Sequence, residues 1–253
     1  MSTLALKILL TPVLILAASG AGRRWGESIG GWLVGLPLMS GPIALFLALD
    51  HGSGFAAAAA AGALSGAAAQ ACFCIAYGRT AARLSWPAAL CLGILGFAVS
   101  AVVLQAARLP LWVLVPATLI VLGLVPRGRL RTSEALVLPR WDIPDRMAVA
   151  TVLVVGLTAA APALGPRLSG LLATFPVFAT VLAVFAHRLQ GGAAVQQVLW
   201  GLLLGLFGLA GFFFALAVSI GRAGIAGGFA IAAAVALAIQ GCSLWAMRGG
   251  RRR

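Results

Sequence analysis

The sequence has very little charge for its length. Only 9% of its 253 residues are Asp, Glu, Lys or Arg, whereas 62% are apolar, and the mean hydropathy is +1.08. A soluble domain carries charge on about a quarter of its positions. Too few polar residues are therefore present to cover a water-soluble globule. The composition excludes a soluble single-domain protein, a disordered chain and a disulfide scaffold, and it fits the lipid bilayer as solvent.

Residues that carry most enzyme and metal chemistry are also scarce. The single lysine, Lys7, follows a leucine, so the chain cannot form a Gly-Lys-Ser/Thr phosphate-binding loop. The only histidines, His51 and His187, cannot make an H-E-x-x-H zinc motif. The four cysteines lie in apolar stretches without C-x-x-C spacing, which favours packed thiols over a metal site. We therefore expect no catalytic residue, no metal, no other cofactor and no enzymatic activity.

Long apolar segments dominate the chain, and each can cross about 30 Å of hydrocarbon as a helix. They cover residues 4–22, 28–49, 55–77, 86–106, 110–126, 147–164, 168–187, 194–219 and 225–246. The sequence thus predicts an all-α polytopic membrane protein with about nine transmembrane helices. The first segment is interpreted as an uncleaved span and not as a signal peptide, because Arg23 and Arg24 follow it instead of preceding it.

The net charge of +13 is distributed unevenly between the two sides of this predicted topology. Fourteen of the 18 Lys and Arg residues fall on one set of alternating connections, and four fall on the other. The positive-inside rule then places the amino terminus outside and the carboxyl terminus in the cytoplasm. The positive charge faces the anionic lipids of the inner leaflet, so a nucleic-acid partner is not needed to explain it.

The chain also resembles itself at an offset of 139 residues. Residues 28–76 and 167–215 share eleven of 49 positions, and the paired Pro, Phe and Gly residues carry most of the weight. Each copy holds four predicted spans. The first copy is residues 1–106, the second is 147–253 with a basic tail, and 107–146 forms a linker span and a cytoplasmic loop.

Five crossings before the second copy begins would invert that copy in the membrane. Inverted four-span repeats are typical of secondary transporters, whose binding sites lie at the midplane between the two halves. The alternative is a duplication that only builds a stable symmetric bundle.

One segment of the second copy resembles a known family. The run Gly170-Leu-Leu-Ala-Thr-Phe-Pro176-Val-Phe-Ala, continuing to Ala186-His187 and Gly191, is similar to the second-span motif of the small GlpM-like membrane proteins. The first copy keeps Gly31, Pro37 and Gly52 but has Leu36 and Ala48 where the second has Phe175 and His187. The resemblance implies two fused four-span units in a bacterial inner membrane. It also implies a link to envelope polysaccharide production, for which the family has no defined reaction.

Matching prolines mark the candidate binding and gating site, because proline frees a backbone carbonyl one turn earlier. In lipid such a break is tolerated where it faces protein or water. Its predicted residues are Pro37, Ser40, Gln70, Thr174, Pro176 and Thr180. Two interpretations remain open at this point. The prolines interrupt two helices around a polar site, or they are packing kinks whose threonines bond to their own helix and whose Gln70 bonds to a neighbouring helix.

Two further patterns bear on packing and on energy coupling. Gly62-x-x-x-Gly66 and Gly201-x-x-x-Gly205 occupy equivalent places in the two copies, and small residues at this spacing predict close helix packing. The five acidic residues all lie at predicted ends or in loops. We therefore expect no buried carboxylate, which argues against a proton-driven pump.

The function expected from these features is transport of a small neutral or amphipathic molecule through a site between the two repeats. The alternative is a non-transporting scaffold or accessory protein of an envelope-synthesis assembly. In that case the partner would be another membrane protein or a second copy of this chain.

Overall fold

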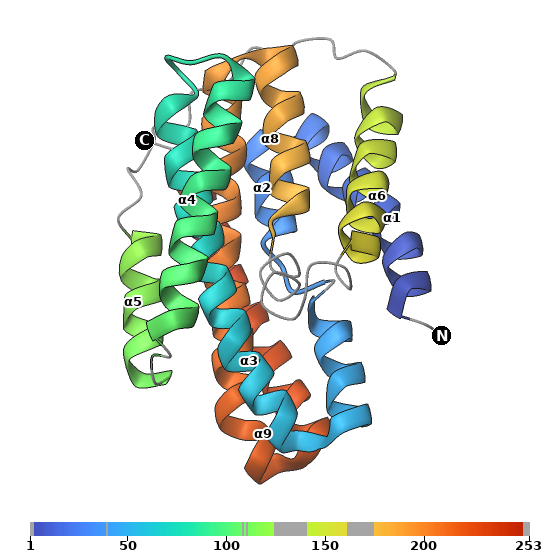
Figure 1. The fold of residues 1–253 in the computed structure, drawn as a ribbon, viewed down its shortest axis with the longest axis vertical. Helices are drawn as coiled ribbons and strands as arrows, with labels where there is room; N and C mark the ends of the chain where they lie inside the picture. Colours follow the sequence, from blue (N-terminus) through green and yellow to red (C-terminus); the bar gives the residue numbers. More distant parts are fainter. Residues whose placement is uncertain are drawn as a thin grey trace.

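The computed structural model describes residues 3–38, 40–107, 109, 111–123, 141–160 and 175–249, and every regular element in these ranges is an α-helix. The helices are α1 (Thr3–Trp25), α2 (Glu27–Val34), α3 (Ser40–Thr80), α4 (Trp86–Ala107), α5 (Leu111–Gly123), α6 (Asp142–Ala160), α8 (Val177–Gln190) and α9 (Gly192–Gly249). Figure 1 shows them gathered roughly along one axis. The expected all-α class is confirmed for the described part of the chain.

Nine spanning helices are not supported. Within the described ranges, three helices are long and apolar enough to cross a membrane: α3, α4 and the part of α9 that ends at Trp245. The second expected span, 28–49, is divided because α2 ends at Val34 after eight residues and α3 begins only at Ser40. The 14-residue helix α8 is likewise shorter than a full crossing.

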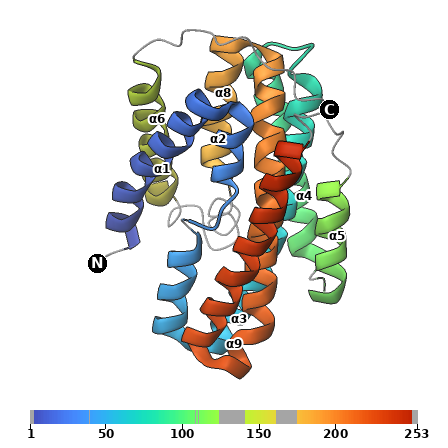
Figure 2. The same cartoon turned by 180° about the vertical axis from the view of Figure 1, so that it is seen from behind.

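The two longest helices, α3 and α9, are each built of two arms that meet at a glycine. The arms of α3 meet at Gly52 (φ 85°, ψ 172°) and those of α9 at Gly224 (φ 69°, ψ −179°). Residues that have a Cβ almost never adopt this combination of positive φ and ψ near 180°, so both sharp turns require glycine. Figures 1 and 2 show the two turns at the same end of the molecule.

Several helix boundaries in the second copy lie about 139 residues after those in the first, which is the same offset at which the sequence repeats. The first helix of the first copy begins at Thr3, and that of the second copy begins at Asp142. The second copy therefore begins before the expected residue 147. The short arm before Gly52 corresponds to α8, which ends at Gln190, immediately before Gly191. Gly191 (φ 85°, ψ −178°) adopts nearly the same backbone angles as Gly52. Over these residues the backbone repeats together with the sequence.

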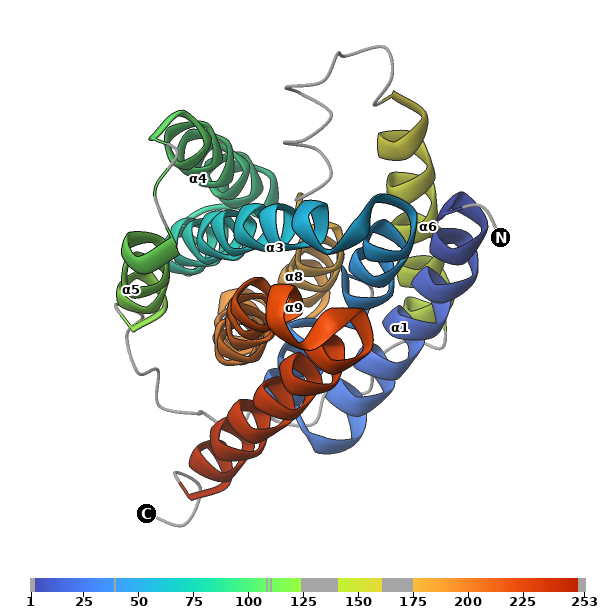
Figure 3. The same cartoon turned by 90° about the horizontal axis from the view of Figure 1, so that it is seen from below.

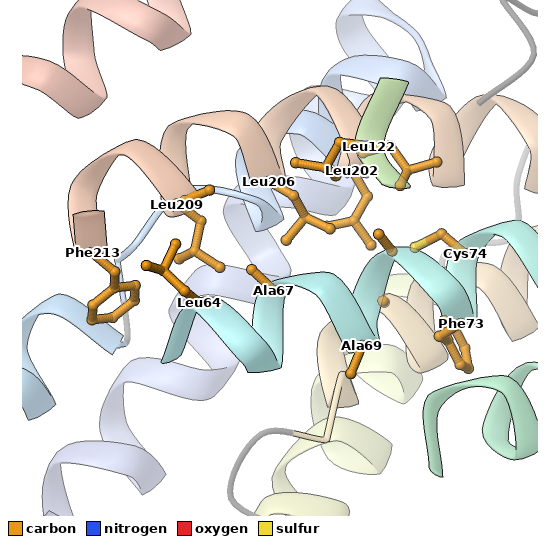
Figure 4. Close-up of a cluster of buried hydrophobic side chains, with 14 of the residues drawn as sticks. Leu64, Ala67, Ala69, Phe73, Cys74, Leu122, Leu202, Leu206, Leu209 and Phe213 are labelled. Atoms are coloured by element: carbon orange, nitrogen blue, oxygen red, sulfur yellow. The ribbon is translucent and has the colours of Figure 1, made fainter. Parts of the chain in front are cut away.

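The main core lies between the long arms of α3 and α9. Figure 4 shows Leu64 and Ala67 of α3 near Leu206 and Leu209 of α9 within one cluster of buried side chains. A second and smaller cluster joins α1, α6 and α8 on the other side of the molecule. Its buried members are Ile15, Ala150, Val154, Val177, Val181 and Phe185. Figure 3 places α1 and α6 side by side, away from α4 and α5.

Helix α2 lies directly on the first arm of α9. A Cβ added at Gly31 would overlap the carbonyl of Val198, and one added at Gly201 would overlap the carbonyl of Ser28. The two helices therefore approach backbone to backbone, which only residues without a side chain allow.

Candidate functional site

A cavity of about 1060 Å³ lies where α2, α3 and α8 meet in the middle of the molecule. Its described lining is mostly aliphatic and aromatic, from α1, α2, α3, α6, α8 and α9, with contributions from α4 and α5. The polar side chains among the lining residues are Ser40, Ser65, Gln70 and Gln105. All four are uncharged, and no described lining residue carries a charge. Such a wall suits a molecule that is largely apolar and carries hydrogen-bonding groups.

Two short helical segments begin at this cavity. Ser40 opens the first arm of α3, and Val177 opens α8; both residues line the cavity. The amide of Gly41 donates to the carbonyl of Pro37 (2.8 Å), and the amide of Thr180 donates to the carbonyl of Pro176 (2.9 Å). These two bonds are equivalent at the 139-residue offset. Each proline thus supplies the carbonyl for the first turn of a helix that starts at the cavity.

Both prolines therefore lie just before the start of a helix and not inside one. Pro37 lies in the turn between α2 and α3, and Pro176 immediately precedes α8. A proline disfavours helical geometry in the residue before it and has no amide hydrogen, so it is better placed at a helix start than inside a helix.

The structure gathers some of the predicted site residues and separates others. Ser40, Gln70 and Pro176 line the cavity, whereas Pro37 and Thr180 are not among its lining residues. Thr174 lies outside the described residues. Thr180 is only 7% exposed, and its hydroxyl has no hydrogen-bond partner in the described part of the chain. It is therefore not bonded back to its own helix.

The two glycine pairs are used differently. Gly62 and Gly66 line the cavity. Gly201 and Gly205 lie against the backbone of α2, at Ser28 and Gly35. Equivalent sequence positions thus shape the cavity in one copy and allow a close helix contact in the other.

Sequence reasoning missed a buried ion-paired cluster. Asp142 is 0% exposed and accepts hydrogen bonds from Arg146 Nε (2.7 Å) and Arg23 Nη2 (3.0 Å). Arg146 is itself 2% exposed, and its guanidinium lies 5.4 Å from the ring centroid of Phe185. The expectation that no carboxylate is buried is wrong. The i, i+4 spacing of Asp142 and Arg146 at a helix start was the available signal.

Comparisons with protein-family models, with curated proteins and with solved structures found no match. The resemblance to the GlpM-like proteins therefore stays a prediction. The described residues contain no group of three or more His, Cys, Asp or Glu side chains that could hold a metal ion. What the site offers is a partly open, mostly apolar cavity with a few neutral hydrogen-bonding groups, which is suited to binding.

Proposed function

We propose that the protein carries a small neutral or amphipathic molecule across a bacterial inner membrane through this central cavity. The single observation that supports this most is a cavity of about 1060 Å³ at the point where two short helical segments begin. Transporters with internal repeats bind substrate near the midplane, beside helices that are broken there. The proposal assigns substrate contact to Ser40, Gln70 and Pro176 and to their apolar neighbours.

The same proposal includes an inverted arrangement of the two copies. In Figure 1 the first arm of α3 and its counterpart α8 run from the middle of the molecule towards opposite ends. That is the relation expected if one copy is turned over in the membrane. Nine crossings, with the amino terminus outside and the carboxyl terminus in the cytoplasm, belong to this proposal.

The charge distribution supports the orientation. Asp142 accepts from Arg23, and Glu27 accepts from Gln190 (2.8 Å), so the ends of α1 and α8 and the start of α6 lie together. Arg188 lies over the ring of Trp86, which begins α4 at this same end. We call this end, which carries Arg23, Arg24, Arg79, Arg83, Arg146 and Arg188, the arginine-rich end. Under the positive-inside rule it faces the cytoplasm.

Substituted-cysteine labelling tests the proposal. Cysteine would be placed at Ser40 or at Ala179, which are equivalent at the repeat offset and both line the cavity, after replacement of Cys72, Cys74, Cys91 and Cys242. A membrane-impermeant thiol reagent would then be added from each side of the membrane in turn. We expect both positions to react, because substrate must reach them through water from either side.

Three matched positions control this experiment. Ala48 lies on the same arm as Ser40 but is fully buried and does not line the cavity, so a cysteine there should stay unreacted. Arg83 and Arg222 are exposed at opposite ends and should react from opposite sides. If the two end controls react while neither cavity position does from either side, the transport proposal is wrong. A non-transporting scaffold would then be the better explanation.

A further inference from the structure

The seam between α1, α6 and α8 runs from the arginine-rich end to the cavity. At its outer edge lie the paired side chains of Arg23, Asp142 and Arg146. Arg23 is five residues, or about 8 Å along the helix axis, beyond Ala18, which lines the cavity. The ion-paired cluster thus lies at the outer end of the seam, and the cavity lies at its inner end.

An apolar layer separates the ion pairs from the cavity. One turn inward from the Arg23–Asp142 pair are Ser19 on α1 and Arg146 on α6, and the next turn brings Ile15 and Ala150 into the same small buried cluster. The inner members of this cluster, Val154 on α6 and Val177 on α8, line the cavity themselves. The seam is therefore a thin layer of side chains and not part of the main core.

Hydrogen bonding in this seam is incomplete. Three buried side-chain atoms in the described part of the chain have no hydrogen-bond partner: Ser19 Oγ, Arg146 Nη2 and Thr180 Oγ1. They belong to α1, α6 and α8, one on each helix of the seam. A buried polar atom without a partner makes the closed arrangement less stable than a fully paired one. Separation of α1 and α6 would let water reach Ser19 Oγ and Arg146 Nη2.

The neighbours of α6 allow such a movement. Its main contacts among the described helices are with α1 and α8, and it lies outside the packed pair of α3 and α9. The contact with α1 includes the Arg23–Asp142 ion pair, whereas the contact with α8 rests on the small apolar cluster and on the Arg146–Phe185 stacking. Among the described residues, an ion pair therefore joins α6 to α1 and none joins it to α8.

We propose that α1 and α6 form a gate at the arginine-rich end, and that Asp142 keeps the gate shut by pairing with Arg23 of α1, while Arg146, four residues along on α6, shares its charge. This inference rests on the proposed transport function, because a gate serves a cavity that exchanges its contents. Asp142 and Arg146 are positioning residues here, since neither is among the lining residues of the cavity. In the arrangement observed, the gate at this end is closed.

The first test measures the side from which the cavity can be reached. Asp142→Asn would be introduced into the cysteine-replaced chain that carries Ala179→Cys, and labelling rates would be measured from each side. We expect the rate from the arginine-rich end to rise about tenfold or more, because a neutral amide no longer balances two guanidinium groups. The rate from the other end should not rise. Asp142→Glu should keep the original rates, as should Asp145→Asn, which changes an exposed carboxylate on the same helix.

The second test follows the helix movement itself and does not depend on the cavity. Spin labels would be attached at Ala148 on α6 and at Arg83 between α3 and α4, because both positions are exposed. Their distance distribution should broaden or shift in the Asp142→Asn variant. A pair at Arg83 and Arg222 should stay unchanged. If Asp142→Asn does not yield a folded protein, Arg23→Gln removes one of the two ion pairs and should act in the same direction, by about threefold in labelling rate.

Failure of the gate and failure of transport would be distinguishable. Suppose that the cysteine placed at Ala179 reacts from the far side, but neither the rate from the arginine-rich end nor the Ala148–Arg83 distance changes. The gate is then wrong and the transport proposal stands. If the same cysteine reacts in no variant while the end controls react, the transport proposal is wrong, and with it the gate.

Discussion

The α3–α9 core and the α1–α6–α8 seam satisfy their polar groups in different ways. In the core region, Gln240 Nε2 donates to the carbonyl of Gly205 (2.9 Å), and Trp32 Nε1 of α2 donates to Ser243 Oγ (2.8 Å). In the seam, Asp142 is shared by two arginines, and Ser19 Oγ and Arg146 Nη2 have no partner in the described part of the chain. The core has a large apolar cluster with paired polar groups, and the seam has a small apolar cluster and one carboxylate that serves two arginines.

The difference indicates which region can move. A packed apolar core loses many small contacts at once if its helices separate, so it behaves as a rigid body. A seam with a small apolar cluster can open locally while the rest stays folded. The first arm of α9 belongs to the rigid part, since Gly201 and Gly205 bring its backbone against α2.

The largest expected effect comes from removing the carboxylate of the seam. Asp142→Ala leaves Arg146 buried without its partner, and breaking a buried ion pair in this way costs about 3–5 kcal/mol. We expect this cost to appear as local opening, with amide hydrogen exchange on α6 faster by on the order of a hundredfold or more. Exchange on the long arms of α3 and α9 should change little. Asp145→Ala, which removes an exposed carboxylate of α6, is the control; equal acceleration in all helices would argue against a separate seam.

The next effect concerns the contact between α2 and α9. In Gly201→Ala the new Cβ would overlap the backbone carbonyl of Ser28, so we expect a loss of about 3 kcal/mol or more in unfolding free energy. Gly241→Ala, on the exposed second arm of the same helix, meets no atom within 4 Å and should be neutral or slightly stabilising. Thermal unfolding in detergent compares the two variants. Equal melting temperatures would contradict the close approach of α2 and α9.

A smaller effect compares the two copies at their shared turn. Gly52 and Gly191 have the same φ of 85°, and a Cβ at either would meet no atom within 4 Å. Alanine should therefore cost only the backbone strain, about 1–3 kcal/mol in each case. Gly54→Ala, at an exposed helical position, serves as the control. Thermal unfolding compares the loss of stability in Gly52→Ala with that in Gly191→Ala. A clear difference between the two losses would show that the two turns are not equivalent.

The smallest effect distinguishes paired from unpaired polar groups. Ser19→Ala removes a buried hydroxyl without a partner in the described part of the chain, so we expect no loss of stability, or a gain of up to about 1 kcal/mol. Gln240→Leu removes the donor to the Gly205 carbonyl and should cost about 1 kcal/mol. Melting temperatures of the two variants should therefore shift in opposite directions or differ clearly. A clear loss in Ser19→Ala would mean that the hydroxyl is bonded after all.

Part of the candidate site could be predicted from residue identity. Proline disfavours a helix interior, and Pro37 and Pro176 stand at matched positions of the two copies, so they indicated two helix breaks. Proline alone was not decisive, because Pro12 and Pro116 lie inside α1 and α5. Whether each break lies within a span or at the start of a helix depends on the residues before it. Here α2 ends at Val34 and α3 begins at Ser40, so Pro37 lies just before a helix start. Pro176 likewise lies just before α8, which begins at Val177. Ser40 was expected near the break because it follows Pro37 by one helical turn.

Other parts could not be predicted because they depend on distant packing. Gly201 and Gly62 are equivalent in sequence, yet one lies against Ser28 and the other lines the cavity. Asp142 follows a loop in the sequence, a position usually exposed to water. It is buried because α1, which is 119 residues away in the chain, packs against α6 and presents Arg23 to it.

The sequence by itself determined the helical class, the fit to an apolar solvent and the repeat offset, because composition and local periodicity are properties of neighbouring residues. It also indicated candidate helix breaks at the matched prolines Pro37 and Pro176, but not which prolines break a helix, because Pro12 and Pro116 lie inside α1 and α5. The tertiary structure decided which polar groups meet and which are buried without a partner. Those outcomes depend on which helix faces lie together, and that arrangement is set by the packing of segments more than a hundred residues apart.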